Sequence, residues 1–217
     1  MLSTYDKIPQ ELLEENLITV AKVLPPDTWF IFFGSLLGMV RESRLIEGDD
    51  DIDIYVDRED TAKVTDALKR AGFRVSMDFR PFFMQFFAPV SGRDVPIDFY
   101  FFEKNENVLT ESWNFFGDPD DPEKTLKIPR EMIYPIRKIW FCDVEIPVPA
   151  RAEEACRFLY GNEWRYPMKK SIGYRMNVIN GTPYMRKPTL REFLSAWNKI
   201  HLRARIRDFR KLILRKL

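Results

Sequence analysis

The sequence predicts an α+β domain in which helices pack on one face or both faces of a β-sheet. The apolar pattern reads helix, strand, helix, strand, helix, and then a run of strands. With 217 residues, 45% of them hydrophobic and 14% aromatic, the chain can also bury a sizeable core. One domain, or one domain with a helical appendage, is expected at this length.

The first half of the chain carries clear signals for alternating helices and strands. The predicted elements are, in order, a helix over 9–24, a strand over 29–33, a helix with its N-cap near Ser35, a strand over 52–56 and a helix over 60–72. Pro25-Pro26 ends the first helix, and Gly72 is placed to end the last. Residues 52–56 are β-branched or aromatic at alternate positions, which favours a strand.

The second half predicts more strands and then helices. The predicted strands cover 74–79, 82–89 and 95–103, a hairpin covers 139–148 around Cys142-Asp143, and helices cover 152–160 and 190–217. Residues 104–138 are expected to be rich in loops, and the glycines and prolines of 161–189 predict an irregular segment.

The formal net charge of +1 hides two strong local fields. Residues 41–60 hold nine acids against three bases, a net of −6. Residues 199–217 hold eight bases against one acid, a net of +7, and their apolar residues recur at helical spacing. This basic amphipathic helix is expected either to pack on the domain or to attach it to an anionic membrane surface.

The counts of cysteine and histidine exclude much site chemistry. Two cysteines and one histidine cannot build a cysteine-rich zinc site, so a bound metal would be held mainly by oxygen, which favours Mg²⁺ or Mn²⁺. Cys142 and Cys156 are expected to be buried thiols rather than a disulfide. Residues 1–17 resemble no signal peptide, so we expect a cytoplasmic protein, either free or peripheral at the inner membrane face.

A carboxylate cluster is the main candidate site. Asp51 and Asp53 are two apart at the start of a predicted strand, so they face the same side, with Asp49 just beyond. Asp98 is the lone acid in an apolar strand, and an unpaired buried carboxylate costs several kcal/mol. A divalent cation would remove both the repulsion between these neighbouring carboxylates and the cost of burying Asp98. The alternatives are a solvated acidic turn and a solvent-facing Asp98.

These residues carry a family resemblance. Gly-Ser, a helix, Asp-apolar-Asp on a strand and a third Asp on a later strand form the pattern of the nucleotidyltransferase superfamily. Residues 34–41 (GSLLGMVR) followed by 49–54 (DDDIDI) resemble more narrowly the LicD/fukutin phosphotransferases, as do Ile133-Tyr134-Pro135 and 159–164 (LYGNEW). The resemblance implies a mixed sheet with packed helices. It divides the chain into a catalytic core with an N-terminal helix, 1–150, and a helical C-terminal region, 151–217.

The resemblance also implies a reaction. A phospho-alcohol, such as phosphocholine or an alditol phosphate, would pass from a CDP-linked donor to a hydroxyl of a glycan or glycolipid, releasing CMP. Asp51 and Asp53 would bind the metal, with or without Asp49, and Asp98 would be a further ligand or the base. The donor phosphate would be held by three residues: Gly34, Ser35 and Arg41.

Two other functions stay open from the sequence. The same carboxylates could serve a nucleotidyltransferase that uses a nucleoside triphosphate, or the domain could be inactive and only bind a nucleotide or a partner. Nucleic-acid binding is not expected, because no recognised binding motif accompanies the basic tail.

Overall fold

The computed structural model describes residues 8–89, 94–112, 125–167 and 175–186. The helices are α1 Gln10–Val23, α2 Phe33–Glu42, α3 Thr61–Arg70, α4 Arg130–Ile133 and α5 Ala152–Tyr160, with a short 3₁₀ turn η1 Arg58–Asp60. The strands are β1 Trp29–Ile31, β2 Ile52–Asp57, β3 Arg74–Phe79, β4 Phe83–Phe87, β5 Pro96–Lys104, β6 Val108–Glu111, β7 Leu126–Pro129, β8 Arg137–Phe141, β9 Val144–Val148, β10 Arg175–Ile179 and β11 Thr182–Arg186.

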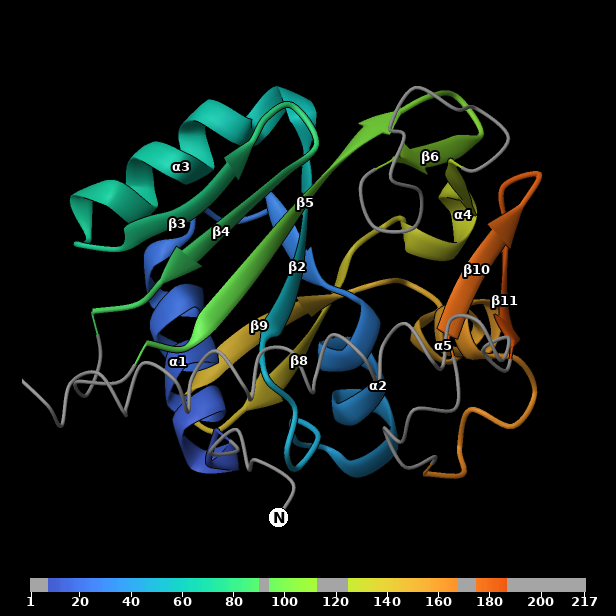
Figure 1. The fold of residues 1–217 in the computed structure, drawn as a ribbon, viewed down its shortest axis with the longest axis horizontal. Helices are drawn as coiled ribbons and strands as arrows, with labels where there is room; N and C mark the ends of the chain where they lie inside the picture. Colours follow the sequence, from blue (N-terminus) through green and yellow to red (C-terminus); the bar gives the residue numbers. More distant parts are fainter. Residues whose placement is uncertain (1–7, 90–93, 113–124, 168–174, 187–217) are drawn as a thin grey trace, which may run out of the picture.

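A seven-stranded sheet forms the centre of the molecule (Figure 1). Its main path runs β1-β2-β5-β4-β3, and β6 and β7 extend it from the end of β5. The pairing of β2 with β5 is parallel, whereas β1-β2, β5-β4 and β4-β3 are antiparallel. The predicted α+β class with a mixed sheet and packed helices is therefore confirmed.

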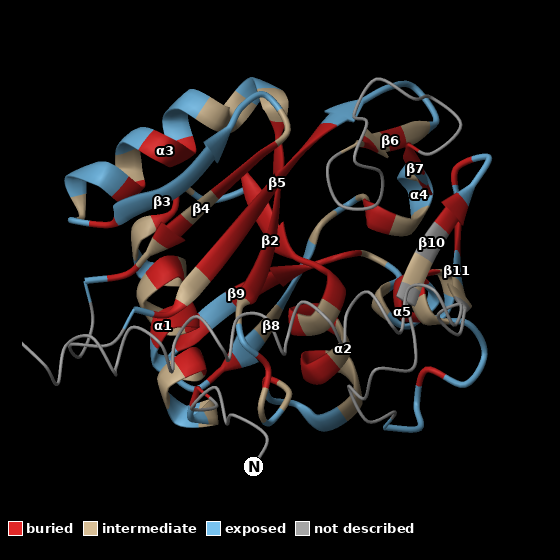
Figure 2. Cartoon of the chain, in the orientation of Figure 1, coloured by how far each residue is buried: buried red, intermediate tan, exposed pale blue. Residues whose placement is uncertain are grey.

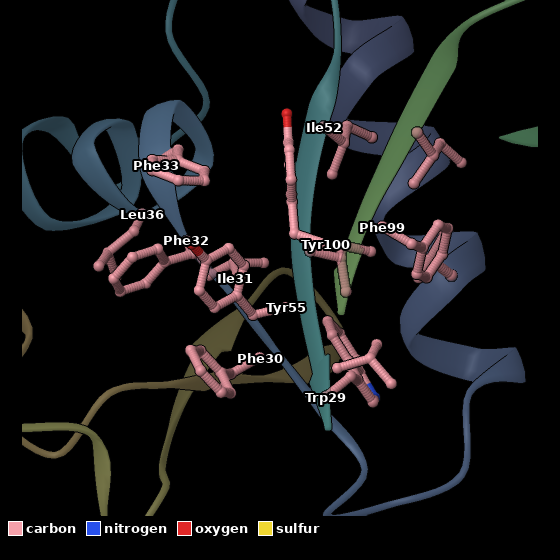
Figure 3. Close-up of a cluster of buried hydrophobic side chains, with 14 of the residues drawn as sticks. Trp29, Phe30, Ile31, Phe32, Phe33, Leu36, Ile52, Tyr55, Phe99 and Tyr100 are labelled. Atoms are coloured by element: carbon pink, nitrogen blue, oxygen red, sulfur yellow. The ribbon is translucent and has the colours of Figure 1, made fainter. Parts of the chain in front are cut away.

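The two faces of the central strands meet different helices (Figure 3). Ile52 and Phe99 lie on the side of α1, whereas Tyr55 and Tyr100 lie on the side of α2. All six residues of β2 are buried, as expected for a strand covered on both faces. By contrast, all six residues of the edge strand β3 are exposed (Figure 2).

Aromatic rings fill the space between α2 and the sheet. The ring centroids of Phe32 and Tyr55 are 4.4 Å apart, and those of Phe33 and Tyr100 are 5.2 Å apart. Edge-to-face and tilted pairs of this kind add to the stabilisation from buried area. The packing fixes the start of α2 against β2 and β5, which is where the acidic residues lie.

Most of the elements predicted from the first 104 residues are confirmed, but Ser35 is not an N-cap. The helix α2 begins two residues earlier, at Phe33, with Phe32 in the cap position. Ser35 is buried, and its hydroxyl oxygen accepts a hydrogen bond from the backbone N–H of Asp53 at 2.9 Å. The serine therefore joins α2 to β2 instead of capping the helix.

One prediction for the second half is wrong and another is incomplete. The segment 161–189, predicted to be irregular, contains the hairpin β10-β11, which turns at Asn180-Gly181. Residues 104–138 contain β6, β7 and α4 in addition to the predicted loops. The predicted hairpin over 139–148 and the helix over 152–160 are confirmed. The predicted helix 190–217, including the basic tail 199–217, lies outside the described residues.

Both cysteines are free thiols, as expected, but only Cys156 is buried. Cys142 is exposed because it occupies the turn between β8 and β9, where its φ is +51°. Within the described ranges, no helix is long and apolar enough to span a membrane. The division of the chain at residue 150 stays a prediction.

Candidate active site

Asp53, in β2, is held by the first residues of α2. The backbone N–H of Gly34 donates to Asp53 Oδ2 at 2.9 Å, and the N–H of Phe32 donates to the Asp53 carbonyl at 3.1 Å. With the bond to Ser35 described above, both the backbone and the side chain of Asp53 are fixed. The Gly-Ser pair therefore holds a buried carboxylate in place.

Asp98 lies beside Asp53 on the neighbouring strand. The two residues are direct partners in the parallel register of β2 and β5, about 5 Å apart. The hydroxyl of Tyr100 lies 3.3 Å from Asp53 Oδ1 and 3.4 Å from Asp98 Oδ2, so it can donate its proton to only one of them at a time. Gln85, on β4, donates from Nε2 to Asp98 Oδ1 at 2.8 Å.

Three further carboxylates precede β2. Asp49, Asp50 and Asp51 each offer a carboxylate oxygen within 4.8 Å of the others. A Cβ placed on Gly34 would lie 2.8 Å from Asp49 Oδ2 and 3.2 Å from Asp53 Oδ2. A larger residue at this position would therefore displace one or both of these carboxylates.

Burial and mutual repulsion raise the pKa of the buried carboxyls. The pKa of Asp53 lies well above its usual range, first because of burial and then because of the charges of Asp51, Asp49 and Asp98. Burial also raises the pKa of Asp98 to about 6, against the opposing effect of its bonds to Gln85 and Tyr100. The metal-free cluster therefore resists full ionisation.

This donor set fits a hard divalent cation. All of its candidate ligands are carboxylate oxygens, which Mg²⁺ and Mn²⁺ prefer. Two such carboxylates, those of Asp49 and Asp53, converge beside Gly34. A cation bound there would offset the repulsion that raises the pKa of Asp53.

The structure brings together the four predicted acidic residues, Asp49, Asp51, Asp53 and Asp98. Gly34 and Ser35 also lie at the site. The Gly34 N–H and the Ser35 hydroxyl both bond to Asp53, so a donor phosphate would be bound by other N–H groups at the start of α2. Arg41 lies in the last turn of α2, at the opposite end from Gly34, and forms an ion pair with Glu42 at 2.6 Å. Its predicted contact with a phosphate stays a prediction.

Sequence reasoning missed three residues of this site: Asp50, Gln85 and Tyr100. Gln85 is the lone polar residue in Phe82–Phe87, the same signal that identified Asp98 in β5. Tyr100 had no such signal, because its hydroxyl reaches the site only through the pairing of β5 with β2.

The mixed sheet and its acidic site define a nucleotidyltransferase-like domain. The family model described as "LicD/FKTN/FKRP, nucleotidyltransferase domain" matches residues 27–151. The chain belongs to the LicD/FKTN/FKRP family, and this membership indicates a transferase.

Two solved structures show limited similarity to the chain. One is a lincosamide antibiotic adenylyltransferase, LnuA, bound to lincomycin. It aligns with a TM-score of 0.42 and 17% sequence identity, over 57% of this chain and 70% of the other. The second is a putative nucleotidyltransferase from Thermotoga maritima. It aligns with a TM-score of 0.32 and 11% sequence identity, over 97% of this chain and 98% of the other. No curated protein matches the chain.

Proposed function

We propose that this protein is a metal-dependent phosphotransferase. It would move a phospho-alcohol, phosphocholine or an alditol phosphate, from a CDP-linked donor to a hydroxyl of a glycan or glycolipid, and release CMP. The observation that supports this most is the register that sets Asp53 beside Asp98, with Asp49 and Asp51 next to them. Family membership supports a transferase of this kind.

In this proposal, Asp49, Asp51 and Asp53 hold Mg²⁺ or Mn²⁺. When bound, the cation would neutralise charge on the phosphate groups and help to orient them. The contacts from Gly34 and Ser35 keep Asp53 in position without side-chain rearrangement. Such preorganisation matters because phosphoryl transfer depends more on positioning and charge than on covalent chemistry.

We assign Asp98 the role of base. The oxygen of the acceptor hydroxyl forms a bond to the phosphorus that carries the alcohol, the bond from that phosphorus to the CMP oxygen breaks, and Asp98 takes the hydroxyl proton. Gln85 holds Oδ1 of this carboxylate, and Oδ2 can take the proton while the Tyr100 hydroxyl donates to Asp53. A carboxylate whose pKa is about 6 is a stronger base than an ordinary aspartate.

A donor assay tests the proposal. The full chain, with Mg²⁺ and a glycan acceptor, is offered CDP-choline, CDP-ribitol, CDP-glycerol and, separately, nucleoside triphosphates. We expect CMP release from one of the CDP donors, with a loss of at least a hundredfold in Asp53→Asn and Asp98→Asn. Asp143→Asn is a matched control, because this exposed carboxylate pairs with Lys22 outside the cluster.

Two outcomes would contradict the proposal. Pyrophosphate release from a nucleoside triphosphate would favour the nucleotidyltransferase alternative. No turnover of either donor class with Mg²⁺ or Mn²⁺ would favour a binding domain without activity.

We further propose that residues 199–217 bring the domain to an anionic membrane surface at which a glycolipid acceptor is found. Their net charge of +7 and amphipathic spacing support this. Co-sedimentation with vesicles containing anionic lipid, compared with zwitterionic vesicles, tests it. Equal recovery with the two would contradict it.

A further inference from the structure

The hydroxyl of Tyr100 lies between the two carboxylates that the parallel pairing of β2 and β5 sets side by side. Its oxygen is 3.3 Å from Asp53 Oδ1 and 3.4 Å from Asp98 Oδ2. Aromatic neighbours hold the ring in place, because its centroid lies 5.2 Å from that of Phe33 and 5.3 Å from that of Phe83. Tyr100 is only 5% exposed, so its hydroxyl must find its hydrogen-bonding partners within the site.

The neighbouring tyrosine on β2 uses its hydroxyl differently. Tyr55 is the register partner of Tyr100, and the ring centroids of the two residues are 5.8 Å apart. The Tyr55 hydroxyl, however, contacts Glu111 Oε2 at 3.3 Å, and Glu111 is fully buried in β6. Two paired tyrosines of one aromatic layer therefore direct their hydroxyls to different carboxylates, and Tyr100 is the one that reaches the site.

Both contacts of Tyr100 can be hydrogen bonds at the same time only when one of the two carboxylates carries a proton. Two gaps separate the phenol oxygen from Asp53 Oδ1 and Asp98 Oδ2, and each gap needs one proton. Burial, and then the neighbouring carboxylates, raise the pKa of Tyr100, so the phenol keeps its proton and fills one gap. Because Asp53 would be ionised as a ligand of the cation, the phenol donates to Asp53 and accepts from Asp98. This is the arrangement after Asp98 has taken the proton of the acceptor hydroxyl.

We propose that Tyr100 is a positioning residue that joins the base to the cation site, an inference that rests on the proposed function. Its hydroxyl donates to Asp53 Oδ1 and accepts from Asp98 Oδ2 once that oxygen has taken the proton of the acceptor. In this step the O–H bond of the acceptor breaks and an O–H bond to Asp98 forms, while Tyr100 keeps its own proton. The contact therefore stabilises the protonated base that the reaction produces. It also holds Asp53 Oδ1, so that Asp53 Oδ2 stays beside Gly34, where the Asp49 carboxylate also lies.

The test compares Tyr100→Phe with the wild type, both as the full chain, in two separate measurements. The first is the affinity for Mn²⁺ without a donor, from a titration followed by electron paramagnetic resonance, and it reports on Asp53. The second is kcat for CMP release at saturating Mn²⁺, together with KM for the CDP-linked donor, and it reports on Asp98. Tyr55→Phe is the matched control, because it removes the hydroxyl of the paired tyrosine, whose bond goes to Glu111. Thermal unfolding checks that each variant is folded.

We expect Tyr100→Phe to bind Mn²⁺ about tenfold more weakly and to have a kcat about tenfold lower at saturating Mn²⁺, with KM for the donor close to that of the wild type. Tyr55→Phe should lower the unfolding temperature but leave both measurements as in the wild type. A wild-type value of Tyr100→Phe in either measurement would overturn the proposal, because the hydroxyl would then serve only one carboxylate or neither. Equal losses in Tyr55→Phe would also overturn it, because they would come from the aromatic packing.

A failure of the proposed function gives a different result. A wild type that binds Mn²⁺ but releases no CMP from any CDP-linked donor would contradict the proposed function, and with it the role given to Asp98. The Mn²⁺ titration needs no donor, so it would still show whether Tyr100 holds Asp53 in place.

Discussion

At the residue scale, the site depends on how a buried carboxylate is oriented, and Gln85 is the clearest case. Its side-chain amide donates to Asp98 and accepts from the Ser76 hydroxyl at 2.9 Å, so it links Asp98 to the edge of the sheet. A residue that orients a catalytic carboxylate affects the reaction without touching the substrate.

We expect Gln85→Ala to lower the rate of CMP release by about tenfold, because Asp98, the proposed base, loses the bond that fixes one of its oxygens. The donor assay with Mg²⁺ measures this. Ser76→Ala, which removes only the outer bond, should have a smaller effect. A wild-type rate in Gln85→Ala would show that Gln85 does not position the carboxylate.

The raised pKa of Asp98 also predicts how the stability of the metal-free protein depends on pH. Its pKa is about 6 in the fold, against about 4 in an unfolded chain, so the folded state binds more protons between these values. Stability in EDTA should therefore fall as the pH rises from about 4 to 7, by up to about 3 kcal/mol from this residue. Burial and repulsion at Asp53 act in the same direction.

Asp98→Asn should reduce this slope and raise the unfolding temperature at pH 7.5 in EDTA, measured by differential scanning calorimetry. Asp143→Asn serves as the control, because the Lys22 ammonium lowers the pKa of Asp143 and its removal should not reduce the slope. A wild type that becomes more stable between pH 5 and 7, or equal slopes in wild type and Asp98→Asn, would contradict this account.

At the scale of elements, Gly38 fixes the distance between α2 and the segment that leads to the acidic residues. A Cβ on Gly38 would lie 2.7 Å from the carbonyl oxygen of Arg44 and 2.9 Å from the nitrogen of Ile46. Both are backbone atoms, so the segment before Asp49 must shift.

We expect Gly38→Ala to lower the free energy of unfolding by about 1–3 kcal/mol and to weaken Mn²⁺ binding as well. Urea denaturation measures the free energy of unfolding, and a titration of Mn²⁺ followed by electron paramagnetic resonance measures the binding. Leu68→Ala on α3 is the comparison, because it removes buried apolar volume without touching this segment. If Gly38→Ala bound Mn²⁺ as tightly as the wild type, the segment would not be positioned by α2.

The same scale shows what could be predicted from the sequence. The strand over 74–79 was predicted with the observed bounds, because its limits are set by Gly72 and by Pro81. The strands β6 and β7 have only four residues each and pair with one another, so their stability depends on partners that no local pattern reveals. Asp98 could be identified because it is a lone acid among apolar residues, whereas its position beside Asp53 became known only from the register.

The Gly-Ser pair makes a contact that the motif alone does not predict. The sequence places Gly34 and Ser35 before a helix, where free N–H groups favour an anion. In the fold, the anion that the N–H of Gly34 contacts is the Asp53 carboxylate. This contact joins residues 19 positions apart and depends on the packing of α2 against β2.

At the scale of the whole molecule, part of the acidic charge is buried inside the fold: Asp49, Asp53 and Asp57 are the buried acids among residues 41–60. The formal net charge is only +1, yet Asp49, Asp53 and Asp98 are buried and lie within one site. Because like charges destabilise the compact state, a cation that binds only the folded protein should stabilise it by mass action.

Mg²⁺ should therefore raise the unfolding temperature, and more at pH 7.5 than at pH 5, where protons compete for the carboxylates. At a Mg²⁺ concentration a hundred times its dissociation constant, the stabilisation is about 2.7 kcal/mol. Thermal unfolding at both pH values, with Mg²⁺ or EDTA at matched ionic strength, measures this, and Asp53→Asn should lose most of the response. Equal stabilisation of wild type and Asp53→Asn would show that the ion acts through general screening, in which case this cluster is not its binding site.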